Sequence, residues 1–337
     1  MVEEYPKIDE LQIGSTILGF YLVDKKQVLQ TKAGNDYVKL YLMDKTGKIP
    51  AVMWDNFVDV IDTFGKDDII KVQAQVQSHQ NKPQLRLFRL RKAERDEYRE
   101  DNFYPQSDYD VEELFNSLVT VGESIENEFM RRLLNMLFED EELMSKFKRA
   151  PGGKALHHVN RGGLIEHVYS VVQVCEFMAE HYKRIDRNLL ITSAIFHDIG
   201  KVDELTYERS FDYSDEGRLL GHIVQGVIIL EGMVNKIPEF PEKLALALKH
   251  ILVSHHGCFE YGSPKLPMIL EALILHYIED LDAKINSFSM WLDDQVDIEN
   301  PNWTKYWSLY DRFLFRWDKS YSESEHNKNN IDEDSSQ

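Results

Sequence analysis

The sequence is poor in cysteine, in basic residues and in long apolar runs, and each shortage excludes a class of protein. Two cysteines, Cys175 and Cys258, occur in 337 residues. They are too few for a disulfide framework or a four-thiolate zinc site, and their scarcity suits a reducing compartment. The acidic N-terminus lacks the apolar core of a signal peptide, and no run approaches the roughly 18 apolar residues of a membrane span. We therefore expect a cytoplasmic protein without a membrane partner.

Charge is acidic overall but uneven along the chain. Lysine and arginine number 39 against 58 aspartates and glutamates, a formal charge of −19. The sum argues against a polyanionic partner, because phosphate binding needs clustered cations. Residues 71–95, however, hold seven cations and one acid, a local balance of +6. Charge alone leaves two interpretations of this segment open, a nucleic-acid contact surface and a basic edge strand that resists aggregation.

Two patterns divide the chain. In residues 1–95, five short β-branched and aromatic runs are separated by turn signals such as AspLysThrGly at 44–47, which is typical of a small antiparallel barrel. Residues 96–150 predict a polar linker and connecting helices, and a helical period continues through residues 151–317. The tail, residues 318–337, is acidic and poor in apolar residues, so we expect it to be disordered.

Histidine is concentrated in the helical part. Ten of the twelve histidines lie between His157 and His276, and several share a stripe with apolar side chains, which directs them inward. One inward histidine is usually a hydrogen-bonded core residue. Several together favour convergence on a divalent cation, because a shared ion satisfies buried imidazoles. Asp198, next to His197, adds the anionic oxygen that hard and borderline cations prefer.

The order of these residues resembles the HD-domain superfamily of metal-dependent phosphohydrolases over about residues 150–290. The motifs that carry the resemblance are Glu166-His167, His197-Asp198-Ile199-Gly200-Lys201, Gly221-His222, His255-His256-Gly257 and a late aspartate. The resemblance implies one metal held by His167, His197, Asp198 and that late aspartate, with His222, His255 and His256 as ligands of a second ion. For the late aspartate the family pattern favours Asp280, and Asp282 stays the alternative.

The chemistry expected of such a centre is hydrolysis. A metal-bound water has a pKa lowered towards neutrality, and the resulting hydroxide can attack phosphorus in line. Lys201, three residues after Asp198, is expected to reach a phosphate or the departing oxygen, so we assign catalytic roles to both residues. The family implies one or two divalent cations, with Mn²⁺ preferred and Mg²⁺, Co²⁺ or Fe²⁺ as alternatives.

The N-terminal pattern resembles an oligonucleotide-binding (OB) fold, carried by LeuMetAspLysThrGlyLysIleProAlaValMetTrp. Such folds stack bases on aromatic side chains while cations follow the phosphates. The candidates are Tyr37, Lys39, Tyr41, Lys48, Trp54, Arg86, Phe88 and Arg89. Strand alternation does not place all of them on one face, and core packing is the alternative for each aromatic. Lys154 and Arg161, ahead of the first metal ligand, are further candidates for phosphate contact, with a structured loop as the alternative.

An OB fold ahead of an HD domain, with ArgAlaProGlyGlyLysAlaLeuHisHis leading into AsnArgGlyGlyLeuIleGluHis, resembles the YhaM-type 3′ to 5′ exoribonucleases over nearly the whole chain except the tail. The resemblance implies a metal-dependent phosphodiesterase that trims single-stranded RNA, and leaves single-stranded DNA open as a second substrate. Two alternatives remain, an HD phosphohydrolase of small or cyclic nucleotides with a regulatory barrel, and a non-catalytic RNA-binding protein. The sequence leaves a homo-oligomer open.

Overall fold

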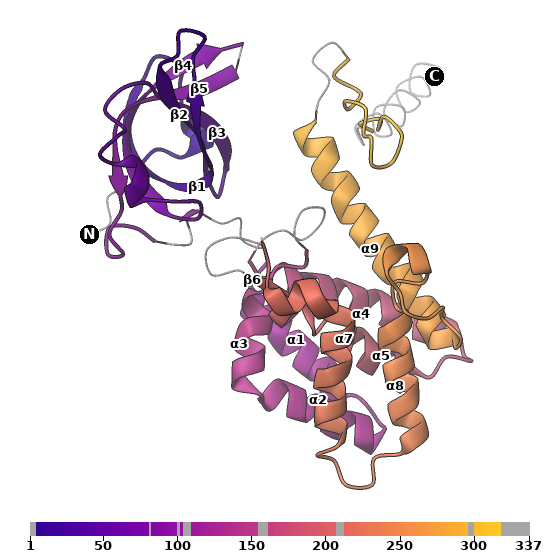
Figure 1. Ribbon diagram of the computed structural model, residues 1–337. Helices are drawn as coiled ribbons and strands as arrows, with labels where there is room; N and C mark the ends of the chain where they lie inside the picture. Colours follow the sequence, from indigo (N-terminus) through magenta and orange to yellow (C-terminus); the bar gives the residue numbers. More distant parts are fainter. Residues whose placement is uncertain are drawn as a thin grey trace, which may run out of the picture. The chain divides into compact units, whose positions relative to one another are not determined.

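A computed structural model describes residues 5–80, 82–99, 102–103, 109–153, 161–206, 212–295 and 300–317 (Figure 1). The chain divides into two compact units, Met1–Asp280 and Leu281–Gln337. The predicted divisions at residues 95, 150 and 317 stay predictions. The acidic tail, for which we expect disorder, and Lys154 lie outside the described residues.

The first five strands form a closed barrel, as predicted. They are β1 (Thr16–Gln30), β2 (Asp36–Asp44), β3 (Gly47–Met53), β4 (Ile69–His79) and β5 (Lys82–Lys92), in the order β1-β2-β3-β5-β4. Pairing of β1 with β4 closes the ring. All pairs are antiparallel except β3 with β5, which run parallel. Two short 3₁₀ helices, η1 (Ile8–Glu10) and η2 (Ile61–Thr63), accompany the strands.

Alternation along β2 and β3 fills the barrel. The inward residues pair across the two strands and are all buried: Val38 with Met53, Leu40 with Ala51, and Leu42 with Ile49. Burying a side chain such as leucine contributes about 1.5–3 kcal/mol relative to exposing it. The predicted hairpin at 44–47 joins these strands, and the buried Asp44 carboxylate fixes it by accepting hydrogen bonds from the backbone N–H groups of Ile8 and Thr46. The remaining residues of each strand face outward.

The rest of the first unit is mainly helical. Its helices are α1 (Val111–Glu123), α2 (Glu128–Glu139), α3 (Glu141–Arg149), α4 (Gly163–His181), α5 (Arg187–Phe196), α6 (Lys201–Glu204), α7 (Asp215–Val234), α8 (Glu242–Ser254) and the first part of α9 (Leu270–Asp294). A small hairpin, β6 (Leu205–Thr206) with β7 (Asp212–Tyr213), interrupts them, and η4 (Phe259–Tyr261) follows α8.

One apolar core joins these helices. The connecting helices contribute Leu118 and Leu134, and the later helices contribute Val168, Phe196 and Leu252, all of them buried. Polar caps fix the starts of the connecting helices, because the carboxylate of Asp110 accepts hydrogen bonds from the first turn of α1 and the side chain of Asn127 does the same for α2. The predicted helical part is therefore confirmed as the frame that carries the histidines.

Residues 300–317, in the second unit, depart from the predicted helical period. Isolated β-bridges join Trp303 to Phe315 and Trp307 to Arg312. Pro301 has no backbone N–H and clashes within a helix interior, so the chain cannot continue the helical ladder there. The expectation of helix up to residue 317 is wrong for this segment.

Helix α7 is, among the described residues, long and apolar enough to cross a membrane by length and composition. Its apolar window is 44% buried inside the protein, and Gly221, with φ of 72°, kinks it next to His222. A buried, kinked helix that carries a polar side chain into the interior is typical of a core helix.

Candidate metal centre

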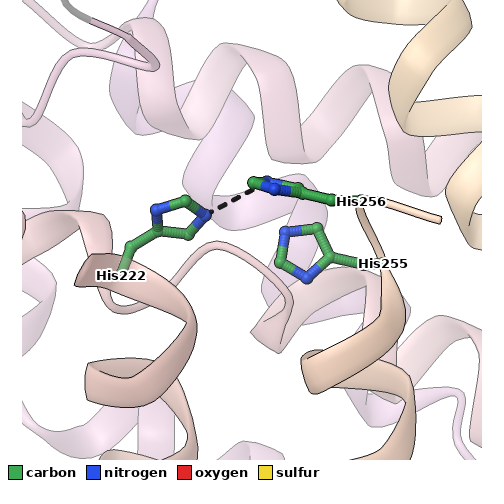
Figure 2. A group of neighbouring side chains, drawn as sticks. All are labelled: His222, His255 and His256. Atoms are coloured by element: carbon green, nitrogen blue, oxygen red, sulfur yellow. Dashed lines mark hydrogen bonds between the residues drawn. The ribbon is translucent and has the colours of Figure 1, made fainter. Parts of the chain in front are cut away.

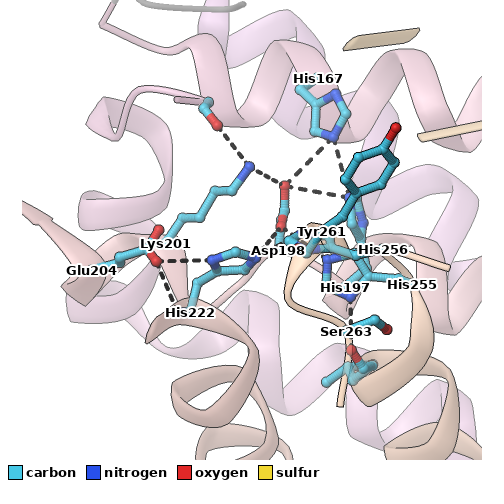
Figure 3. A network of polar contacts seen from close by, with 12 residues as sticks. His167, His197, Asp198, Lys201, Glu204, His222, His255, His256, Tyr261 and Ser263 are labelled. Atoms are coloured by element: carbon cyan, nitrogen blue, oxygen red, sulfur yellow. Dashed lines mark hydrogen bonds and ion pairs between the residues drawn. The ribbon is translucent and has the colours of Figure 1, made fainter. Parts of the chain in front are cut away.

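Four helices bring six of the seven predicted ligands together (Figure 3). His167 lies in α4, His197 directly follows α5 and precedes Asp198, His222 lies just after the kink of α7, and His255 directly follows α8 and precedes His256. His167, His197, Asp198 and His255 are buried. Because helix ends leave the chain free to turn, neighbouring residues such as His197 and Asp198 can both point to the centre.

The first group is formed by His167, His197 and Asp198. The Nε2 atoms of the two histidines are 3.2 Å apart, and they lie 3.5 Å and 3.4 Å from Oδ2 of Asp198. Two donors about 2.1 Å from one ion are separated by about 3.0 Å at a right angle and about 3.4 Å at the tetrahedral angle. The spacing of this group therefore fits a single first-row cation.

The second group is formed by His222, His255 and His256 (Figure 2). Nε2 of His222 lies 3.3 Å from Nε2 of His256, and Nε2 of both His222 and His255 lies 3.6 Å from Oδ1 of Asp198. Asp198 therefore presents one oxygen to each group of histidines. A carboxylate shared in this way fits a pair of cations better than a single one.

Hydrogen bonds fix which ring nitrogen faces the centre. In four histidines Nδ1–H donates to an oxygen that can only accept. The pairs are His197 with the Ala194 carbonyl (2.7 Å), His255 with the Leu252 carbonyl (2.7 Å), His256 with the Tyr261 carbonyl (2.8 Å) and His222 with the Glu204 carboxylate (2.9 Å). The proton therefore resides on Nδ1, and Nε2 keeps a free lone pair for a cation.

Burial and charge set the protonation states. Burial lowers the pKa of His255 to about 3 and that of His256 to about 4, so both rings are neutral at pH 7. Burial alone would raise the pKa of Asp198, but Lys201 and His197 hold it well below its usual range. Burial alone would lower the pKa of His197, whereas the neighbouring Asp198 raises it. The centre thus combines a carboxylate with at least two neutral imidazoles, those of His255 and His256, which is a donor set for borderline cations.

Two buried donor atoms lack partners among the described residues, which supports the fit of a cation. Oδ1 of Asp198 and Nε2 of His255 have no hydrogen bond, and their separation of 3.6 Å is too long for one. A buried polar atom without a partner costs free energy. A cation between the two atoms would satisfy both.

Lys201 is buried beside the carboxylate. Its ammonium lies 2.6 Å from Oδ2 of Asp198 and donates a hydrogen bond to the carbonyl of Gly152 at 2.7 Å. The predicted contact of Lys201 with a substrate phosphate or the departing oxygen stays a prediction. The structure adds that the lysine contacts the metal-facing carboxylate directly.

Glu279 of α9 was not singled out in the sequence, yet it interacts with the centre. Burial and the charge of Asp198 raise the pKa of Glu279 to about 7, so two carboxylates repel each other across the site. Neither Glu279 nor the predicted alternatives for the last ligand, Asp280 and Asp282, belong to either group of described residues that could hold a metal, so the last ligand stays a prediction.

The barrel candidates lie on the outer surface of three neighbouring strands, contrary to the expectation from alternation. On β2 the candidates alternate with the buried residues and therefore face outward. The same alternation along β3 places Trp54, just after the strand, on the outer side. On β5 a bulge next to Phe88 restores Arg89 to the outer side, because Leu87 pairs with Ala74 while Arg89 pairs with Gln73. Regular alternation would have turned Arg89 inward.

Aromatic and cationic side chains on this outer surface contact one another. The rings of Tyr37 and Trp54 stack with centroids 4.7 Å apart, and Trp54 is 44% exposed. Lys39 lies over the ring of Tyr41, and the Arg86 guanidinium lies over the half-exposed Phe88. The arrangement combines exposed aromatic rings with positive charge, which is typical of surfaces that bind single-stranded nucleic acid.

Two other candidates, Lys48 and Arg161, contribute less positive charge or exposed surface for nucleic-acid binding. Lys48 pairs with Asp24 at 3.1 Å, so its charge is partly balanced. Arg161 lies half-buried just before α4.

The comparisons agree with this architecture. The HD domain family matches residues 164–284. The 3′-5′ exoribonuclease YhaM of Bacillus subtilis (strain 168) is 32% identical over 283 residues, which cover 84% of this chain and 89% of that protein. Its counterpart in Geobacillus sp. (strain WCH70) is 34% identical over 264 residues, covering 77% and 80%.

Among solved structures, the second OB-fold domain of replication protein A from Methanococcus maripaludis is 23% identical, with a TM-score of 0.23, over 27% of this chain and 95% of that domain. The expected enzyme class is confirmed by the curated relatives and the HD match. With its five-stranded barrel ahead of an HD domain and relatives of this identity along most of its length, the chain belongs to the family of YhaM 3′-5′ exoribonucleases.

Proposed function

We propose that the protein hydrolyses phosphodiester bonds of single-stranded RNA from the 3′ end, with single-stranded DNA as a second substrate, and that it uses divalent cations to do so. The observation that carries the proposal is Asp198, whose two oxygens face two separate groups of histidines. Bound there, cations such as Mn²⁺ would supply a Lewis acid and an activated water for attack on phosphorus. The names of the curated relatives support the polarity and the substrate.

Each residue of the centre has a proposed task. His167, His197 and Asp198 hold the first cation, and His222, His255 and His256 hold the second. Asp280, with Asp282 as the alternative, stays the proposed further ligand for the first, as the family pattern implies. Glu204 orients His222 through Nδ1, and such outer contacts are typically needed for full metal affinity. Lys201 stabilises negative charge on a phosphate oxygen or on the departing oxygen.

The barrel is the proposed binding surface for single-stranded RNA. The stacked Tyr37 and Trp54, with Lys39, Arg86 and Arg89 nearby on the outer surface, support capture of single-stranded RNA. Action in the cytoplasm is part of the proposal, supported by the scarcity of cysteine.

The test compares Asp198→Ala with Asp203→Ala, which removes a carboxylate of the same chain segment that pairs instead with Lys146 at 3.0 Å. End-labelled single-stranded RNA is incubated with and without added Mn²⁺, the products are resolved with time, and metal content is measured. We expect Asp198→Ala to lose metal and hydrolysis while it keeps RNA binding, because the barrel surface is unchanged. Asp203→Ala should behave like the wild type.

Full activity of Asp198→Ala would exclude the proposed centre. Internal cuts instead of shortening from the 3′ end would indicate an endonuclease. A third outcome would favour a small-nucleotide phosphohydrolase. In that case the protein would hydrolyse mononucleotides or cyclic dinucleotides but would not trim RNA, and Trp54→Ala would not change the rate.

A further inference from the structure

A tight loop after the second pair of ligands ties an aromatic residue to the centre. After His256 the chain enters η4, and the carbonyl of Tyr261 accepts the hydrogen bond from Nδ1 of His256. Only one imidazole ring therefore separates the backbone of Tyr261 from the position of the second cation. The side chain of Tyr261 is 61% exposed, and Figure 3 shows its ring together with the side chains of the centre.

The loop is held in one conformation. Gly257 has φ of 75°, and a Cβ at this position would come within 2.1 Å of the ring of His276, so only glycine fits. The backbone N–H of Cys258 donates to the carbonyl of His256, and the buried Ser263 hydroxyl bonds to a carbonyl of α8. The ring of Tyr261 is thus carried by a rigid loop, and its exposure follows from the fold.

We propose that Tyr261 stacks on the nucleobase of the 3′-terminal nucleotide while the adjoining phosphodiester is held at the metal centre. The inference rests on the proposed function. An enzyme that removes nucleotides one at a time from any sequence needs a contact that every base offers, and each base has a π-face. Stacking also needs no cation, so it suits a protein with a charge of −19.

Two parts of Tyr261 are proposed to act at the site, its backbone carbonyl and its ring. The carbonyl of Tyr261 orients a metal ligand, and its ring occupies the adjacent exposed surface, so the base and the centre are set relative to each other by one rigid residue. Phe259, 62% exposed in the same turn, points about 120° away in a helix of three residues per turn. It therefore serves as the matched control.

The test uses the full chain and single-stranded RNA with 2-aminopurine as the 3′-terminal base and a non-hydrolysable phosphonate as the last linkage, in the presence of Mn²⁺, so that the strand is held at the centre without turnover. Stacking on tyrosine quenches the fluorescence of this base. We expect quenching with the wild type, with Tyr261→Phe and with Phe259→Ala, and little with Tyr261→Ala. In turnover with Mn²⁺, Tyr261→Ala should raise KM by about 5- to 100-fold with a smaller change in kcat. The effect should vanish on RNA whose last nucleotide is abasic.

Metal content of Tyr261→Ala should equal that of the wild type, because the carbonyl that orients His256 is retained. Quenching that is absent in the wild type, or unchanged in Tyr261→Ala, overturns the inference even if RNA is trimmed. If quenching depends on Tyr261 but the protein does not trim RNA, the base contact is supported and the proposed function is rejected.

Discussion

The closest backbone approach beside the centre makes Gly200→Ala a sharp perturbation. A Cβ added at Gly200 would lie 2.0 Å from the carbonyl oxygen of His222 and 2.6 Å from the backbone nitrogen of Gly226. Ordinary contact requires about 3.4 Å or more between such atoms. The obstructing atoms are backbone atoms of α7, so no rotamer change relieves the clash. The start of α6 and the kinked part of α7 must move apart by more than about 1 Å.

The expected magnitude follows from that displacement. Overpacking a core typically costs 1–3 kcal/mol, and because both sides here are backbone we expect about 3 kcal/mol, or a Tm lowered by about 6–12 °C. His222 would move away from Asp198 with α7. A misplacement of about 1 Å can reduce catalysis by about 100-fold, and the second group of histidines should lose its cation before the first.

Thermal unfolding, metal content per chain and the rate of RNA trimming measure these effects. The control is Gly232→Ala, also on α7, where a Cβ would meet nothing within 4 Å. Replacing an exposed helical glycine by alanine should stabilise the protein by about 0.5–1 kcal/mol and leave metal content unchanged. A Gly200→Ala protein with wild-type Tm, metal content and activity would refute the close packing of α6 on α7 as the support of His222.

Three further predictions concern the cations. Glu204→Gln should weaken metal binding by about 10- to 100-fold, as seen by calorimetry, because Nδ1 of His222 loses a charged acceptor. Added Mn²⁺ at about 100 times its Kd should stabilise the fold by about 2.7 kcal/mol in thermal unfolding, and a chelator should reverse the gain. Metal affinity should fall as pH falls through neutrality, because the raised pKa of His197 lets protons compete, whereas His255 and His256, with pKa values of about 3 and 4, stay neutral. Calorimetry in two buffers of different ionisation enthalpy would count the released protons, and a pH-independent affinity would contradict the assignment.

The fold was predictable because a strand-like hydrophobic period in the first part of the chain gives way to a helical period in the rest. Inward residues such as Leu40 and Leu42 recur every second position, and buried residues such as Leu133 and Leu137 recur at helical spacing. The parallel pairing of β3 with β5 and the bulge at Phe88 were not predictable, since closure of a barrel is a property of the whole sheet.

The histidines and Asp198 of the centre were predictable as a set, whereas its last ligand stays a prediction. The order of motifs indicated the histidines and Asp198. Asp280 was chosen because the family pattern favours it, with its position one turn after His276 as further support. In the structure His276 is a support, because its Nδ1 bonds to the carbonyl of His255 and its ring packs against Gly257. The position relative to His276 therefore lends Asp280 no support, and Asp280 stays a prediction from the family pattern; the charge of Asp198 raises the pKa of the neighbouring Glu279.

The conflict between an acidic protein and a polyanionic substrate yields a final prediction. On the outer barrel surface the rings of Tyr37 and Trp54 can stack bases without any charge, and Lys48 is already paired with Asp24. About three cations then remain to displace counterions. The logarithm of the RNA association constant should therefore fall against the logarithm of salt concentration with a slope of about −2, since each contact on a single strand contributes about −0.7.

Replacing one of the three cations separates the two contributions. Arg86→Gln should make that slope shallower by about 0.7, whereas Trp54→Ala should weaken RNA binding by a similar factor at every salt concentration and leave the slope unchanged. Anisotropy titrations of labelled RNA without divalent metal measure both. A wild-type slope of about −6 would mean that far more cations contact the strand than this surface holds, and capture would then have to be assigned to other parts of the chain.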